Sequence, residues 1–442
     1  MAGLTKPNID QINIDPITLP QGHYNQGQFP QPMHGFAGPD IPAQTAGTTT
    51  NVSGDAEVVV PFPSAFIPGM YVIATGNVMV SGLYRVTSVG NASITLHGYE
   101  GDLVGSQLKP INATITTTGE GLNLSFRSAS LSNIVIIATS TPYGVIQGSK
   151  YEQGNNKPTC NIGSASYVGV DGGTRAAWVV GGSGSALGVD NIAIMNCNIG
   201  LLSVHGASVV GTGAYIKDSG EDSFKCEHSS MMYLTTGNAL RTSSQSHVGC
   251  RYASSQEMAG FHFLSPTTAF TTSQFNSYVS LRDCTMSGST TYGLNAVDGG
   301  VIALNNIDLS GSSGTTPIRA SNGAIIRSVG ANSNLVGSYT GANVIEASNV
   351  QVNGTTLSGR KVRSTITPGS INAGARFSQQ RSLPGYRIGE DAASLNLTVL
   401  GELPIGVIPF VIGLGEDLIR VTLQNVGSTT ASIPTLDILV SY

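Results

Sequence analysis

A motif that recurs at a nearly constant spacing constrains the fold of this chain more than any other feature. The small residues at its third position stand at 207, 230, 277, 300 and 323, so three steps are 23 and one is 47, close to two repeats. We expect Ser246–Arg251 to supply the copy missing from the longer step, with an inserted loop. The aligned copies are His205–Gly211, His228–Leu234, Phe275–Leu281, Asp298–Leu304 and Ser321–Arg327.

Apolar side chains return at the same place in each copy. Two residues after the small residue stand Val209, Met232, Val279, Ile302 and Ile325. Alternate positions of a strand point to one face, so stacked copies would form continuous apolar ladders that no single copy could bury. The pattern predicts an all-β chain built on a right-handed parallel β-helix. The competing interpretation is an antiparallel β-sandwich with coincidental spacing, which rarely keeps one period over so many segments.

The composition supports an all-β fold and excludes other classes. Charged residues make up 11% of the 442 residues, against roughly 25% in an average globular chain, which is too few for the charged faces of surface helices. The net charge of −5 and the lack of a basic run argue against nucleic-acid binding. No apolar stretch is long enough for membrane insertion. The first residues lack the apolar region of a signal peptide, so we expect assembly in a cytoplasm.

The cysteines do not suggest a metal or cofactor site. They are scattered and lack the CxxC spacing of a metal-binding pair, so we expect buried free thiols, no metal and no cofactor. The five are Cys160, Cys197, Cys226, Cys250 and Cys284.

The chain divides into four expected regions. Residues 1–45 form an extended arm, 46–115 a small β-domain, 116–358 the β-helix, and 359–442 a C-terminal, jelly-roll-like β-sandwich with clean strand alternation. The first region is rich in Pro, Gln, Asn and Gly and carries too little apolar surface to fold alone. It is either a disordered tail or an arm that becomes ordered against a partner. We favour the arm because Phe29, Met33, Phe36 and Ile41 are spaced like anchors.

These residues carry a resemblance to virus proteins. Rungs of the form Asp298–Leu304 look like those of bacteriophage tailspikes and tail fibres with a pectate-lyase-like β-helix. Three C-terminal segments, Gly369–Gly374, Pro384–Asp391 and Val421–Asn425, are similar to a small β-sandwich that recurs in phage structural proteins. The resemblance covers roughly residues 190–442. It implies a homotrimer, receptor binding at the distal end and N-terminal attachment to the virion.

Polysaccharide-cleaving tailspikes need paired carboxylates, one to protonate the leaving oxygen and one as base or nucleophile. The densest acidic cluster here supplies the candidate catalytic residues Asp218, Glu221, Asp222 and Glu227. The alternative is a solvated loop whose acids are neutralised by Lys217 and Lys225. A lyase in which His228 or Tyr215 removes a proton is a weaker interpretation.

Sugar binding needs aromatic faces. The candidates, which we expect to be exposed around an irregular rung, are Tyr252, Phe261, Phe263, Tyr278 and Tyr292. Trp178 fits core packing as well as it fits a sugar platform.

The sequence therefore favours a bacteriophage tail fibre or tailspike, located on the virion tail and assembled in the host cytoplasm. Its partners would be itself as a homotrimer, phage tail or head attachment proteins, and host surface polysaccharide bound during adsorption. Two alternatives stay open. One is a glycan depolymerase, acting as glycosidase or lyase, and the other is a head fibre or capsid decoration protein.

Overall fold

A computed structural model describes residues 16–29, 35–124, 128–148, 162–242, 244–288, 291–312, 318–322, 324–328, 333–335, 339–340, 343–352, 355–382, 395–415 and 418–441. Within these residues the regular elements are β-strands and two short 3₁₀ turns. None of the described residues forms a helix that could cross a membrane. The chain splits into two compact units, residues 1–271 and 272–442.

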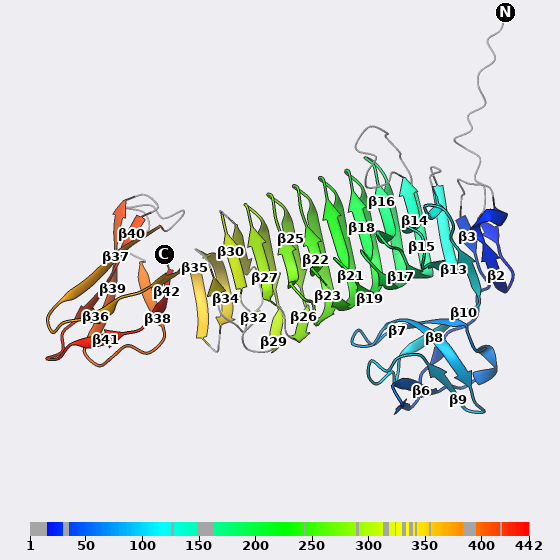
Figure 1. Ribbon diagram of the computed structural model, residues 1–442, viewed down its shortest axis with the longest axis horizontal. Helices are drawn as coiled ribbons and strands as arrows, with labels where there is room; N and C mark the ends of the chain where they lie inside the picture. The colour runs from blue at the N-terminus through cyan, green and yellow to red at the C-terminus, as the bar shows by residue number, and fades with distance from the viewer. Residues whose placement is uncertain are drawn as a thin grey trace, which may run out of the picture. The chain divides into compact units, whose positions relative to one another are not determined.

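The first unit contains a parallel β-helix. Its long strands pair in parallel, each with the next, to form the first sheet. Its short strands pair in the same way to form the second sheet, so each coil contributes one strand to each (Figure 1). The long strands are β13 (Ser128–Ala138), β15 (Ile162–Gly172), β17 (Ala186–Cys197), β19 (Ser208–Ser219), β21 (Met231–Thr242) and β23 (Ser255–Leu264). The short strands are β14 (Tyr143–Gly148), β16 (Ala176–Gly181), β18 (Leu201–Val204), β20 (Phe224–Glu227) and β22 (Ser246–Cys250).

Ladders of apolar side chains fill the interior, as the repeat predicts. In the first sheet Val209 pairs with Met232, and neither has measurable exposure. In the second sheet one register position holds Trp178 beside Leu201, which answers whether this tryptophan is core or surface. This ladder consists of Val145, Trp178, Leu201, Phe224 and Val248.

Each long strand bends at one shared register position. The residue there has a positive φ in every coil, which Gly and Asn adopt most easily. Because neighbouring strands pair on both sides of it, even Tyr167 and Thr236 take this conformation. The series is Asn133, Tyr167, Asn191, Gly213, Thr236 and Gly260.

Part of the expected N-terminal arm belongs to the β-helix instead. Strands β2 (Gly22–Asn25) and β3 (Gly35–Ala37) pair in parallel with β11 (Ala113–Thr116) and β13, and β1 (Ile17–Thr18) pairs with β3. Phe36 is fully buried and its ring lies 4.9 Å from that of Phe29. These strands cover the first coil, because an open solenoid end would expose its core. Residues 1–15 and the anchor Met33 lie outside the described residues.

A small antiparallel domain lies beside the coils in the first unit (Figure 1). Its sheet follows the order β4 (Gln44–Thr45), β10 (Gln107–Ile111), β7 (Tyr71–Thr75), β8 (Gly82–Val89), β9 (Ser93–Leu96), β6 (Asp55–Val59) and β5 (Thr49–Val52). Tyr71, Ile73 and Leu83 share a buried cluster with Val135 and Tyr215 of the first sheet.

Polar contacts add to this docking. The Tyr71 hydroxyl donates to Asp171 at 2.8 Å, and the Asn238 amide donates to the carbonyl oxygens of Val78 and Ser81 at 2.8 and 2.7 Å. Domain and coils are therefore held by both apolar and hydrogen-bonded contacts.

The long step in the repeat has a different cause from the one expected. Ser246–Cys250 is β22, a strand of the second sheet. The missing copy is β23, where Ser255 pairs with Met231 of the preceding coil. The expected assignment of Ser246–Arg251 was wrong because both strands of a coil are apolar, and the alignment could not tell the two sheets apart.

The second unit contains the parallel strands β25 (Tyr278–Arg282), β28 (Val301–Asn305) and β31 (Ile325–Ser328). Val279 pairs with Ile302, as predicted. Ile302 then pairs with Ile326, which is 1% exposed, whereas Ile325 is only half-buried. The predicted register is wrong here because this coil is one residue longer than the repeat requires. A shift of one residue turns inward-facing side chains outward and outward-facing side chains inward.

The parallel order ends at β34 (Asn343–Val352), which pairs antiparallel with β35 (Thr355–Ile366). Three small antiparallel groups follow and share a buried core that includes Ile366, Val421 and Ile438. They are β35 with β42 (Leu436–Ser441) and β38 (Asn396–Leu400), β37 (Arg376–Ser382) with β40 (Leu418–Asn425) and β39 (Val407–Gly415), and β36 (Gly369–Ile371) with β41 (Ala431–Ile433). The motif Pro384–Asp391 lies outside the described residues.

Candidate functional site

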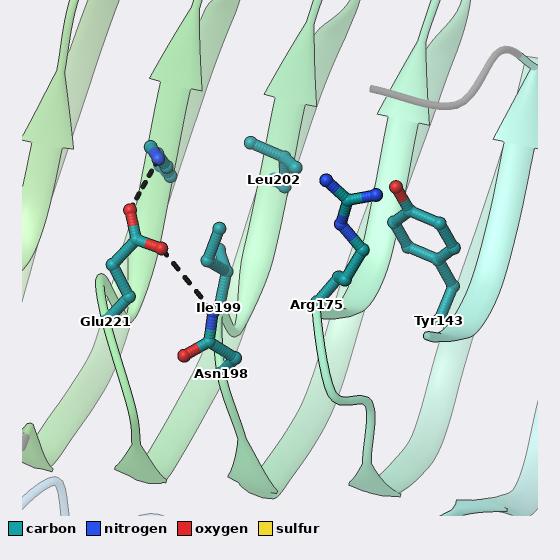
Figure 2. A pocket seen from close by; sticks show the side chains of 7 residues that line it. Tyr143, Arg175, Asn198, Ile199, Leu202 and Glu221 are labelled. Carbon is teal, nitrogen blue, oxygen red and sulfur yellow. Dashed lines mark hydrogen bonds and ion pairs between the residues drawn. The ribbon is translucent and has the colours of Figure 1, made fainter. Parts of the chain in front are cut away.

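A groove of about 280 Å³ crosses the beginning of the second sheet, over strands β14, β16, β18 and β20 (Figure 2). It lies within the first unit. Its lining residues are Tyr143, Arg175, Asn198, Ile199, Leu202, Glu221 and Lys225.

The coil geometry sets its polar side chains in a row. Arg175, Asn198 and Glu221 occupy the same turn of three successive coils, just before β16, β18 and β20. Backbone hydrogen bonds hold these turns together, from Ile199 N to Arg175 O at 3.2 Å and from Glu221 N to Asn198 O at 2.6 Å. Since main-chain pairing positions these residues, the row is rigid.

The groove is amphipathic. Ile199, Leu202 and Tyr143 are 8%, 2% and 2% exposed and form an apolar floor. Arg175, Asn198, Glu221 and Lys225 add a few placed polar groups, the usual composition of a small-molecule site. A sugar ring has an apolar face and polar edges, so its two surfaces match those of the groove.

Glu221 is held in place from two sides. Its Oε1 accepts a hydrogen bond from Lys225 Nζ at 2.7 Å, and its Oε2 accepts one from Asn198 Nδ2 at 3.4 Å (Figure 2). Burial opposes the charge of Lys225, but Asp222, Glu227 and Glu221 together raise the pKa of its ammonium group. The Glu221–Lys225 pair is therefore a fixed charged end of the groove.

Behind this pair lies a buried ionic network. Glu227 is 3.3 Å from Lys225 and 3.5 Å from Arg251, and Asp222 is 3.5 Å from Arg251. Burial raises the pKa of Asp222 to about 6, although Arg251 and Lys225 act in the opposite direction. Asp222 and Glu227 are 0% and 1% exposed, so neither side chain is open to a substrate in this structure.

Asp218 is separate from this network. It lines a second hollow of about 270 Å³ with Cys197 and Arg241. Arg241 binds Asp218 at 2.7 Å and Glu100 of the small domain at 2.6 Å, while Lys217 pairs with Glu100. Of the four candidate carboxylates, only Glu221 reaches the groove. The alternative, a solvated loop neutralised by Lys217 and Lys225, is confirmed for Lys225, which pairs with Glu221 and Glu227. It is wrong for Lys217, which pairs with Glu100, and wrong for the solvation of Asp222 and Glu227, which are buried.

The aromatic candidates differ in exposure. Phe261 and Phe263 are 1% and 0% exposed, so the expectation that they are exposed was wrong. They occupy inward positions of β23, whose register the sequence alignment missed. Tyr252 is 44% exposed and stacks on His228 at 4.8 Å.

The other candidate tyrosines do not line the groove. Tyr278 and Tyr292 belong to the second unit, where Arg327 and Arg319 lie over their rings at 5.9 and 5.6 Å. Tyr215 is 2% exposed, and burial raises the pKa of its hydroxyl to about 12.

Sequence reasoning missed Tyr143, Arg175 and Asn198. A signal for two of them was present, because positions 175, 198 and 221 are separated by the same interval as the strand motif. The alignment followed apolar positions and ignored the polar turn.

No known protein family and no curated protein matches the sequence. The solved structures that this chain matches include two tailspikes in complex with saccharides. The tailspike of Acinetobacter baumannii bacteriophage AP22, in complex with capsular saccharide, is 10% identical, with 96% of this chain and 90% of that chain covered and a TM-score of 0.27. The tailspike of Escherichia coli bacteriophage HK620, in complex with a pentasaccharide, is 8% identical, with 74% of each chain covered and a TM-score of 0.26.

Both are bacteriophage tailspikes. The parallel β-helix of this chain is established by the strand pairing described above.

Proposed function

We propose that this protein is a component of a bacteriophage tail that binds a host surface glycan during adsorption. The observation that carries the proposal is the rigid amphipathic groove, with Ile199 and Leu202 as its floor and Arg175, Asn198 and Glu221 in a row at its edge. The parallel β-helix and the sequence resemblance to phage tail proteins support the same conclusion.

Binding is favoured over cleavage. A glycosidase needs two carboxylates at one site, whereas among the described residues Glu221 is the one acidic side chain that lines the groove. Asp222, with its raised pKa, would suit a general acid, but its side chain is fully buried. We therefore propose an adsorption protein, with depolymerase activity as the alternative.

The proposed assembly is a homotrimer attached to the virion by its N-terminal regions. Three copies would engage the host surface together, so weak individual sites would give strong overall attachment. A gel-filtration or light-scattering mass near 45.5 kDa, the mass of one chain, would argue against this assembly. Immunogold electron microscopy of particles would distinguish a tail location from a head location.

The function is tested by incubating purified full-length protein with polysaccharide from the host bacterium. We expect binding in surface plasmon resonance and competition with phage adsorption, without shortening of the saccharide on gel analysis. The variant Asn198→Ala should weaken binding, whereas Asn305→Ala, a half-buried asparagine of the second unit, should not. Shortened saccharide would establish the depolymerase alternative. No binding and no competition would refute the proposal.

A further inference from the structure

We infer that Cys226 and Cys250 form a reversible disulfide between two neighbouring coils when the protein meets a small-molecule disulfide such as oxidised glutathione. The chemistry follows from the packing of two strands and does not require the proposed function. Only the timing rests on that function, since a phage tail protein would fold in a reducing host cytoplasm and meet oxidants after its release.

The two cysteines are direct neighbours on adjacent strands. Cys226 of β20 pairs with Cys250 of β22 in the parallel second sheet. A backbone hydrogen bond from Arg251 N to Cys226 O at 2.9 Å fixes the strands beside this pair. Neither cysteine has measurable exposure, and each lies two positions after an inward-facing residue of its strand, Phe224 or Val248. Because alternate positions of a strand share a face, both thiols lie in the core.

The two thiols contact one another. Burial raises the pKa of the Cys226 thiol, and a hydrogen bond with the Cys250 thiol raises it further. The Cys226 thiol also lies 3.6 Å from the Ser255 carbonyl oxygen. Cys197, by contrast, belongs to β17 of the first sheet, where its register partner is Ser219. The Cys226 and Cys250 sulfurs can therefore meet without any change in strand pairing.

The strand spacing suits a disulfide under strain. Neighbouring strands lie about 4.8 Å apart, within the roughly 4.4–6.8 Å that a disulfide allows between its Cα atoms. The Cβ atoms of parallel neighbours are separated by about the same spacing, which exceeds the usual disulfide value of about 3.8 Å. Bond formation must therefore draw the two strands together. The resulting strain makes the bond easier to reduce, so it is reversible.

The reaction is a thiol–disulfide exchange in two steps. The thiolate of one cysteine attacks a sulfur of oxidised glutathione, which forms a mixed disulfide and releases one glutathione thiolate. The thiolate of the other cysteine attacks the protein sulfur of the mixed disulfide and releases the second glutathione. In total the two cysteine thiols lose two protons and two electrons, and the glutathione disulfide gains them as two thiols. Since buried thiols are protected from attack, the first step requires local opening of β20 and β22 and is slow.

The bond would tie the coil at the end of the groove to the coil that follows. Lys225, which lines the groove, is next to Cys226 in β20. Closing a loop of residues 226–250 restricts the unfolded chain by an amount equivalent to about 100-fold in an equilibrium constant, and strain removes part of this gain. We therefore expect amide exchange in β20 and β22 to be about 10-fold slower, or more, in the oxidised protein.

The test is oxidation of the full-length protein by oxidised glutathione, with and without mild urea that opens single coils but leaves the chain folded. Remaining thiols are alkylated and the protein is digested with trypsin without reduction. Trypsin releases peptides 226–241 and 242–251, which contain one cysteine each. We expect mass spectrometry to find these peptides joined, two hydrogens lighter than their sum, and separated again by dithiothreitol.

Matched variants identify the two sulfurs. Cys226→Ser and Cys250→Ser should lose the joined peptides, whereas Cys197→Ser should keep them. Serine fits this position, because Ser203 occupies it in the preceding coil, and thermal unfolding that matches reduced wild type shows that the variants are folded.

Three results would overturn the inference. They are joined peptides that appear only after complete unfolding or not at all, a link to a different cysteine, and amide exchange in β20 and β22 that is equally fast in oxidised and reduced protein. None of them concerns saccharide binding by the reduced protein, so the proposed function is decided separately.

Discussion

Adjacent isoleucines in β31 provide a sharp test of the register in the second unit. Ile326 is 1% exposed and pairs with Ile302, whereas Ile325 is half-buried and pairs with Val301. Ile326→Ala removes three buried carbon atoms, worth about 0.8 kcal/mol each, and leaves a cavity, so we expect a loss of about 3 kcal/mol in unfolding free energy. Ile325→Ala should cost about 1 kcal/mol or less, because its side chain already contacts solvent.

Amide hydrogen exchange in β28 and β31 measures this difference locally, which avoids assuming that the whole chain unfolds in one step. A loss of about 3 kcal/mol corresponds to exchange roughly 100-fold faster, while Ile325→Ala should change exchange by less than about 10-fold. The two variants have the same composition, so each controls for the other. Equal effects of the two variants would refute the register. A larger effect of Ile325→Ala would restore the register expected from a strictly regular repeat.

Three further results are expected. Ile302→Asp should prevent folding, because it places an unpaired charge in an apolar ladder; unchanged thermal melting would contradict the ladder. Arg241→Ala should cost about 1–3 kcal/mol in the docking of the small domain. Burial opposes the charge of Glu100, but hydrogen bonds from Arg241 and Lys217 lower its pKa to about 2, so loss of Arg241 would raise that pKa and leave a less well compensated acid. Faster proteolysis of the segments that join the small domain to the coils tests this, and wild-type resistance would oppose it. Burial lowers the pKa of His247 to about 3, below its unfolded value of roughly 6.5. The contribution of this histidine to the free energy of unfolding is therefore complete above about pH 6.5 and is lost as the pH falls toward 3. Asp222, with a pKa raised to about 6, acts in the opposite direction over roughly pH 6–4. His247→Asn should therefore lose less stability than wild type between pH 7 and pH 4 in urea titrations, and identical pH slopes would show that His247 does not control this loss.

The buried histidine illustrates a polar group that sequence patterns do not reveal. His247 Nε2 lies 2.9 Å from the Leu264 carbonyl oxygen and must donate to it. Because burial lowers the pKa of the imidazole to about 3, the ring is neutral at neutral pH, and Nδ1 then accepts from the Ser223 hydroxyl at 3.1 Å. This arrangement arises because β22 and the end of β23 are brought together by the coil, although they are separated along the chain.

The sequence alone determined the recurring parts of the protein. A fixed spacing with apolar residues at alternate positions permits few folds besides a parallel β-helix, since each strand can bury its face only against the next coil. The pairings of Val209 with Met232 and of Val279 with Ile302 follow directly from that spacing. The same spacing connects Arg175, Asn198 and Glu221, so the polar row of the groove was also present in the sequence.

Tertiary structure decided the features that depend on a single position or on distant partners. Lengthening a coil by one position leaves the composition almost unchanged but exchanges the inner and outer faces, which is why Ile326 is buried in place of Ile325. The state of an acidic residue depends on which cation the fold places beside it. Arg241 reaches Glu100 because the small domain docks on the coils, and Glu227 is compensated because Lys225 and Arg251 converge on it. No local pattern contains that information, because these contacts form only after the strands have paired.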